Sequence, residues 1–177
     1  MNTRTLVRIG GGAAVLAGVL RAAASFAAGA SEVERQSLYF VIDLLLLLGL
    51  FTAYAQNHVA FGRWGATGFL TAVAGILMVR SSRAVPGVDL YPAGALAVAV
   101  GWVLLSVVWW RKAQGAWFVP LLLVLSLVTG LVGQIAQRSD VFVASGVIFG
   151  AAMAGIGRQV LLAAAPRSEA SRVDTVQ

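Results

Sequence analysis

The chain has 177 residues, of which 59% are hydrophobic and only 11% charged, and its mean hydropathy is +0.87. Soluble domains are about 45–50% apolar and about 25% charged, so this composition excludes a soluble enzyme, a nucleic-acid-binding domain and a disordered protein, and it predicts a protein embedded in a lipid bilayer. The net charge is +6 and there is no cysteine, which excludes disulfides, thiolate metal sites and cysteine nucleophiles.

Six apolar runs follow one another along the chain, and a membrane-spanning helix needs about 20 residues. These runs must be helices, because backbone polar groups in lipid need partners within their own segment. We therefore predict an all-α transmembrane bundle that forms one domain over residues 1–165, followed by a disordered cytoplasmic tail over 166–177. The predicted spans are 9–28, 38–56, 64–79, 90–110, 117–137 and 141–165.

The start of the chain, over positions 1–30, leaves a five-span alternative open. Arg4 and Arg8 precede an apolar core over 9–20, and an Ala-Gly-Ala pattern follows at 28–30, as in a cleaved secretory signal. Arg21 interrupts this region before the cleavage pattern, so we favour a retained first span.

The charges predict the orientation. Most of the arginines and the single lysine fall on the side that holds the N-terminus, while most of the acidic residues fall on the opposite side, namely Glu32, Glu34, Asp89 and Asp140. Cytoplasmic segments carry an excess of Lys and Arg, so both termini are expected in the cytoplasm. The positive charge then serves topology and attraction to anionic lipid, and no nucleic-acid partner is expected.

The two halves of the chain show a weak similarity when one is slid along the other so that Gly49 pairs with Gly130 and Gly65 with Gly146. Three spans in each half would place the halves in opposite orientations, as in inverted-repeat transporters. Chance agreement is the alternative, and we favour it because Gly, Leu and Ala are abundant in both halves.

Charged residues within spans are costly and tend to pair or to face the bundle interior. Arg21 and Asp43 lie at similar depths in adjacent antiparallel spans, so we predict an ion pair between them, and Tyr54 shares the helix stripe of Asp43. The pair either staples a helical hairpin, which we favour, or lines a pocket for an anionic or zwitterionic ligand or for a proton. A further alternative turns Arg21 toward Glu32 or Glu34.

Small residues predict close helix packing. Gly18 lies on a stripe of small residues in the first span, and Gly146-x-x-x-Gly150 makes one face of the last span smooth. We favour packing within the bundle over a dimer interface for this face.

Catalytic chemistry has little support. The one histidine, His58, lies in a polar loop, so no His-based metal or haem site and no activated serine is expected within the bundle. We expect neither a cofactor nor a metal, and no enzymatic activity.

Two stretches carry a resemblance: residues 38–54, LYFVIDLLLLLGLFTAY, and residues 62–69, GRWGATGF. They resemble small six-span bacterial inner-membrane proteins that have no assigned activity, over residues 5–80. The resemblance implies a bacterial source and an inner-membrane helical bundle, and it transfers no catalytic residue.

Two classes of function follow. The first is a protein that binds or transports a small amphipathic or lipid-like molecule near Arg21 and Asp43. The alternative is a structural or accessory subunit that packs against a partner membrane protein or a second copy. A polar cavity reaching Asp43 would favour the first class, and an outward-facing Gly146/Gly150 surface on a filled bundle would favour the second.

Overall fold

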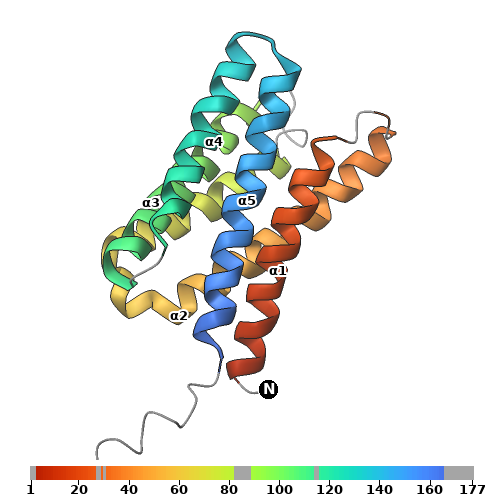
Figure 1. Ribbon diagram of the computed structural model, residues 1–177. Coiled ribbons are helices and arrows are strands. Elements are labelled where there is room, and N and C mark those ends of the chain that lie inside the picture. Colours follow the sequence, from red (N-terminus) through yellow and green to blue (C-terminus); the bar gives the residue numbers. More distant parts are fainter. Residues whose placement is uncertain (1–2, 27–28, 30, 82–88, 114–115, 166–177) are drawn as a thin grey trace, which may run out of the picture.

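The computed structural model describes residues 3–26, 29, 31–81, 89–113 and 116–165. Within these ranges the chain forms five helices, namely α1 (Thr3–Ala24), α2 (Glu32–Ser81), α3 (Tyr91–Ala113), α4 (Phe118–Ile135) and α5 (Ser139–Ala163) (Figure 1). All five are long and apolar enough to cross a membrane. The chain is therefore an all-α, multi-pass membrane protein, as its composition predicts. The tail predicted at 166–177 lies outside the described residues.

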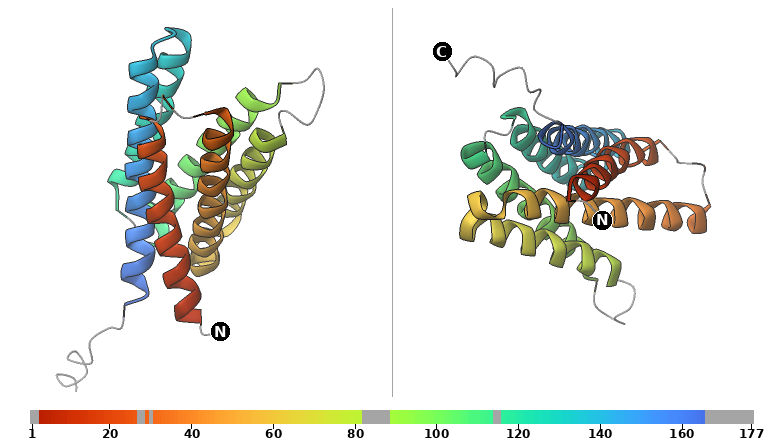
Figure 2. Two further views of the ribbon diagram at one scale, coloured as in Figure 1. Left: turned by 90° about the vertical axis from the view of Figure 1, so that its right-hand side faces the viewer. Right: turned by 90° about the horizontal axis from the view of Figure 1, so that it is seen from below.

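The boundaries of α3, α4 and α5 lie within three residues of the predicted spans, whereas α1 runs over Thr3–Ala24 instead of 9–28, and α2 differs further. This helix has 50 residues and takes in both predicted spans 38–56 and 64–79. A straight helix of that length would measure about 75 Å, more than twice the ~30 Å hydrocarbon core of a bilayer. It is not straight, because Gly62 has φ 54° and ψ −154°, a conformation open mainly to glycine, and α2 reverses direction there (Figure 2).

The two arms of α2, residues 32–61 and 63–81, run antiparallel and in contact. Arg80 Nε lies 2.5 Å from Asp43 Oδ2, although the two residues are 37 positions apart. Nearer the bend, the rings of Tyr54 and Phe69 stack with centroids 4.4 Å apart. α2 is therefore a helical hairpin. Its first arm begins with a capping box, in which Ser31 and Glu34 satisfy each other's backbone N–H groups.

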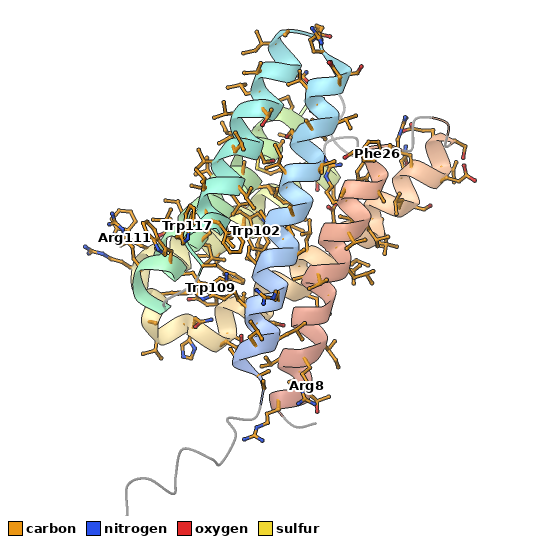
Figure 3. The ribbon with its side chains drawn as sticks, viewed as in Figure 1. Arg8, Phe26, Trp102, Trp109, Arg111 and Trp117 are labelled. Atoms are coloured by element: carbon orange, nitrogen blue, oxygen red, sulfur yellow. The ribbon has the colours of Figure 1, made fainter. Side chains whose placement is uncertain are left out.

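The helices close into a ring in which each one packs on the next and α5 returns to α1. The start of α1, the bend of α2 and the end of α5 lie at one end of the bundle, which we call the near end (Figures 1 and 2). The opposite end, with the end of α1 and both ends of α2, is the far end. Trp102 and Trp109 of α3 lie inside the ring, whereas Arg111 and Trp117 lie at its edge (Figure 3).

Two helix pairs have their backbones in direct contact. Between α1 and α5, a Cβ on Gly18 would collide with the backbone of Gly150, and a Cβ on Gly157 would lie 2.5 Å from the carbonyl oxygen of Gly11. In a bilayer the hydrophobic effect does not drive helices together, because lipid is as apolar as their side chains. Close backbone contacts therefore stabilise the helix pair through dispersion energy. Gly18 and Gly150 therefore lie in a helix contact inside the bundle.

The second pair joins α3 to the second arm of α2. A Cβ on Gly75 would lie 2.7 Å from the carbonyl oxygen of Gly94, and a Cβ on Gly68 would lie 3.0 Å from that of Gly101. None of these four glycines is among the predicted packing residues. Their signal in the sequence is a spacing of seven positions, which is two helical turns and keeps both glycines of a helix on one face.

Candidate functional site

Four polar side chains meet near the far end of the bundle, and we call them the Arg21 cluster: Arg21, Tyr39, Asp43 and Arg80. Arg21 Nη1 donates a hydrogen bond of 3.2 Å to the hydroxyl of Tyr39, and its guanidinium lies 5.2 Å from the centre of that ring. Arg80 Nε donates to Asp43 Oδ2 at 2.5 Å, and its guanidinium lies 5.7 Å from the ring centre of Phe40.

Local sequence explains how the cluster forms. Tyr39 and Asp43 are four positions apart, so they lie on one face of the first arm of α2. Arg21 is in the last turn of α1, and Arg80 is in the last turn of α2. The reversal at Gly62 brings that last turn back beside Asp43, so the cluster depends on the bend.

The predicted ion pair between Arg21 and Asp43 is wrong in its partners. Among the described residues, the carboxylate of Asp43 is paired with Arg80, and Arg21 donates to Tyr39. Arg21 still lies close enough to interact electrostatically with Asp43. The predicted spans leave Arg80 in a loop. A helix that turns back at residue 62 returns to the depth of residue 43 near residue 80, because both stretches have nearly the same length. This equality of arm lengths is the signal in the sequence that points to Arg80.

The alternative that sends Arg21 to the acidic start of α2 has no support. Glu32 forms an ion pair with Arg35 and accepts a hydrogen bond from Gln36. Glu34 accepts hydrogen bonds of 2.8 Å from both the backbone N–H and the hydroxyl of Ser31. These contacts all lie at the start of α2.

The cluster carries an excess of positive charge. The cluster holds two guanidinium groups and one carboxylate, which is paired with Arg80, and Arg21 has only a neutral hydroxyl as its hydrogen-bond acceptor among the described residues. The side chains of Arg80 and Asp43 are 31% and 21% exposed, so the cluster is not sealed. An arginine in such a place can form charge-assisted, bidentate bonds to a carboxylate or phosphate.

Gly146, predicted as a packing residue, lies behind this cluster. A Cβ on Gly146 would collide with Ser25 Oγ and would come within 3.7 Å of Arg21 Nη1. The Gly146/Gly150 face is thus occupied by α1 within the bundle. The accessory-subunit alternative needs this face on the outside of the bundle, so the Gly146/Gly150 face is not available for a partner protein.

Tyr54 does not join the Arg21 cluster. It stacks on Phe69 and lies 6.1 Å from the ring centre of Phe61, whose own ring is 6.2 Å from that of Trp109. These rings fill the space inside the bend of α2, so Tyr54 has a packing role.

A second place with polar character was not predicted. It is a narrow crevice between the end of α3, the start of α4 and the end of α5, at the near end, and it has no room for a water molecule. We call it the Gln159 crevice. Its lining consists of Ser106, Trp109, Trp110, Ala116, Val119 and Gln159. Asp43 is not part of it.

Three buried side-chain atoms lack a hydrogen-bond partner among the described residues. The buried side-chain atoms that have no hydrogen-bond partner within the described ranges are Gln159 Nε2, Trp102 Nε1 and Gln56 Oε1. Trp102 is 1% exposed and lies one turn deeper than Ser106 on α3. Of these three residues only Gln159 lines the crevice, so the unpaired atoms do not define a ligand site.

No protein-family model, curated protein or solved structure matches this chain. The resemblance to small six-span bacterial proteins therefore stays a prediction, and the function rests on the geometry above.

Proposed function

We propose that this chain is a six-span protein of the bacterial inner membrane, with cytoplasmic termini, that binds a small amphipathic molecule with an anionic head through the Arg21 cluster. The six spans are α1, the two arms of α2, α3, α4 and α5. The near end of the bundle then faces the cytoplasm.

The observation that carries the proposal is the unbalanced charge of the cluster. Arginine within a bilayer costs free energy and persists where it has a partner or a function. Arg80 has Asp43 as its counter-ion, whereas Arg21 has a tyrosine hydroxyl. An anionic head would complete the coordination of Arg21.

The surroundings of the cluster favour a ligand with an apolar body. Phe40 beside Arg80 is 53% exposed on the outside of the bundle, where lipid chains would lie. A fatty acid or an anionic phospholipid has both parts that this place requires, namely a negative head at the depth of a helix end and a hydrocarbon chain that stays in the bilayer.

We propose binding rather than catalysis. The sequence has no cysteine and a single histidine, and the cluster has no nucleophile with a general base beside it.

The test measures the thermal stability of the purified protein with added ligand. Phosphatidylglycerol, a fatty acid, phosphatidylcholine and inorganic phosphate are compared. The proposal expects stabilisation by the first two and none by phosphatidylcholine. Stabilisation by phosphate alone would show that the head suffices and that the apolar chain adds no affinity.

Arg21→Gln is expected to weaken binding of the anionic ligand about tenfold or more, because a hydrogen bond to a charged group is worth about 1.5–3 kcal/mol. Arg138→Gln is the matched control, since Arg138 lies at the same end and is paired with Asp140. Equal stabilisation by phosphatidylcholine, or an unchanged response of Arg21→Gln, would overturn the proposal.

A further inference from the structure

The hydrogen-bond donors of the Arg21 cluster divide into an occupied set and a free set. Arg80 Nε is committed to Asp43 Oδ2, at 2.5 Å. The hydroxyl of Tyr39 accepts a hydrogen bond from Arg21 Nη1, so its own hydrogen points away from Arg21, and within the described part of the chain this hydrogen has no acceptor. Arg21 and Tyr39 therefore offer neighbouring donors to the oxygens of one anionic head.

The formal charges of the cluster leave one net positive charge. Arg21 and Arg80 stay protonated in proteins, and the carboxylate of Asp43 is paired with Arg80. Asp43 also lies within electrostatic range of Arg21. A head bound at Arg21 is therefore attracted by two guanidinium groups and repelled by one carboxylate.

The other described acidic side chains at the far end have contacts of their own outside the cluster. These contacts are Glu32 with Arg35, Glu34 with Ser31, Asp89 with the backbone N–H of Tyr91, and Asp140 with Arg138. Among the described carboxylates, Asp43 is thus the one that belongs to the cluster and bears on the charge of its ligand.

One net positive charge favours a head with one negative charge. The attraction between the head and the cluster grows in proportion to the charge of the head, whereas the cost of taking the head out of water grows with the square of that charge. A doubly charged head would thus gain about twice the attraction at about four times the desolvation cost. It would also leave one negative charge uncompensated beside Asp43.

We infer that the Arg21 cluster selects lipids whose head carries a single negative charge, such as a phosphodiester or a fatty-acid carboxylate, over lipids with a phosphomonoester, and that Asp43 sets this selectivity. Arg21 and Tyr39 hold the head. Asp43 keeps Arg80 occupied, so the second guanidinium does not neutralise a second negative charge. The inference rests on the proposed function, because it names the class of head that the same site accepts.

The test compares two lipids that have the same acyl chains. Phosphatidylmethanol has a phosphodiester with one negative charge. Phosphatidate has a phosphomonoester that is almost doubly charged at about pH 8, since such a group loses its second proton at about pH 6. The dissociation constants of both lipids are measured by native mass spectrometry on the purified protein in detergent, with phosphatidylcholine as the lipid without net charge. The unaltered protein should bind phosphatidylmethanol about tenfold more tightly than phosphatidate.

Asp43→Asn removes the carboxylate and frees Arg80 for the head. Its affinity for phosphatidate should rise about tenfold or more, because a second guanidinium then meets the second negative charge. Its affinity for phosphatidylmethanol should rise less, so the preference of the unaltered protein is lost or reversed. Asp140→Asn is the matched control, because it makes the same chemical change in an exposed ion pair at the same end and should change neither constant.

Arg80→Gln is the second variant, and it keeps the inference falsifiable if Asp43→Asn does not fold. It leaves Asp43 without its counter-ion, so the cluster has no net charge. Both lipids should bind more weakly than to the unaltered protein, and phosphatidate should lose the larger factor.

The outcomes separate the inference from the proposed function. Equal or tighter binding of phosphatidate by the unaltered protein, or a ratio of constants that stays the same in Asp43→Asn and Arg80→Gln, would overturn the inference alone. An equal change of the ratio in Asp140→Asn would assign the selectivity to the whole far end and overturn the role of Asp43. Binding of neither anionic lipid beyond that of phosphatidylcholine would overturn the proposed function, and the inference with it.

Discussion

Gly62 reverses the direction of the longest helix with a backbone conformation that other residues adopt only at a cost. A Cβ at this position would meet no other atom within 4 Å, so the whole requirement for glycine lies in the positive φ. One residue thus decides whether residues 32–81 form one rod or a hairpin, and it decides whether Arg80 reaches Asp43.

Gly62→Ala is expected to destabilise the protein by about 1–3 kcal/mol, the cost of a strained backbone conformation. Unfolding in detergent by heat or by denaturant measures it. Gly12→Ala is the matched control, because Gly12 is also free of neighbours within 4 Å but lies in α1, where alanine should be neutral or stabilise by up to about 1 kcal/mol. Equal effects of the two variants would contradict the assignment of strain to Gly62.

The Asp43–Arg80 pair sets a second expectation. Asp43→Leu should destabilise the bundle by about 1–2 kcal/mol because it strands Arg80. This is less than the ~3–5 kcal/mol of a fully buried pair, since the side chains are 21% and 31% exposed. Asp43→Leu combined with Arg80→Leu should restore most of that stability.

Asp43→Leu combined with Arg21→Leu is the comparison for this cycle. It leaves Arg80 without its carboxylate, so it should remain as unstable as Asp43→Leu alone. If stability recovers in Asp43→Leu with Arg21→Leu, and not in Asp43→Leu with Arg80→Leu, the ion pair is the one predicted from the sequence and not the one observed.

Two helix pairs in this bundle, α1 with α5 and α3 with the second arm of α2, are held by backbone contact. Because α1 with α5 and α3 with the second arm of α2 repeat the same contacts, equivalent glycines should carry equivalent energetic weight.

Gly18→Ala and Gly101→Ala should therefore destabilise the protein by similar amounts, about 1–3 kcal/mol, because a Cβ at either position would collide with the partner helix backbone. Denaturant unfolding of both variants provides the measurement. A large loss for one and none for the other would show that the two interfaces are not equivalent.

The molecule as a whole should cross the membrane six times, which reporters can establish. Fusions after Arg35 and after Arg83 should report the periplasm. A cysteine at Val59, which is 84% exposed beside the bend of α2, should be labelled from the cytoplasm. Opposite sides for Arg35 and Arg83 would mean that α2 crosses only once, and cytoplasmic signals from both would invert the orientation.

The length and composition of the apolar runs were enough to predict an all-α membrane protein and to place α3, α4 and α5 to within three residues, whereas the predicted start of α1 was six residues late. The reason is local, since a segment in lipid must satisfy its own backbone and can do so only as a helix of about 20 residues. Depth along a helix is also a local quantity, and it was enough to select Arg21 and Asp43 as members of the polar cluster.

Only the tertiary structure decided which surfaces meet. The partner of Asp43, the packing of Gly146 and Gly150 on α1, and the pairing of Gly68 with Gly101 all depend on how helices distant in the chain are rotated toward one another. In lipid the hydrophobic effect does not rank these rotations, so close backbone packing and a few polar contacts select among them, and those contacts exist only once the helices are assembled.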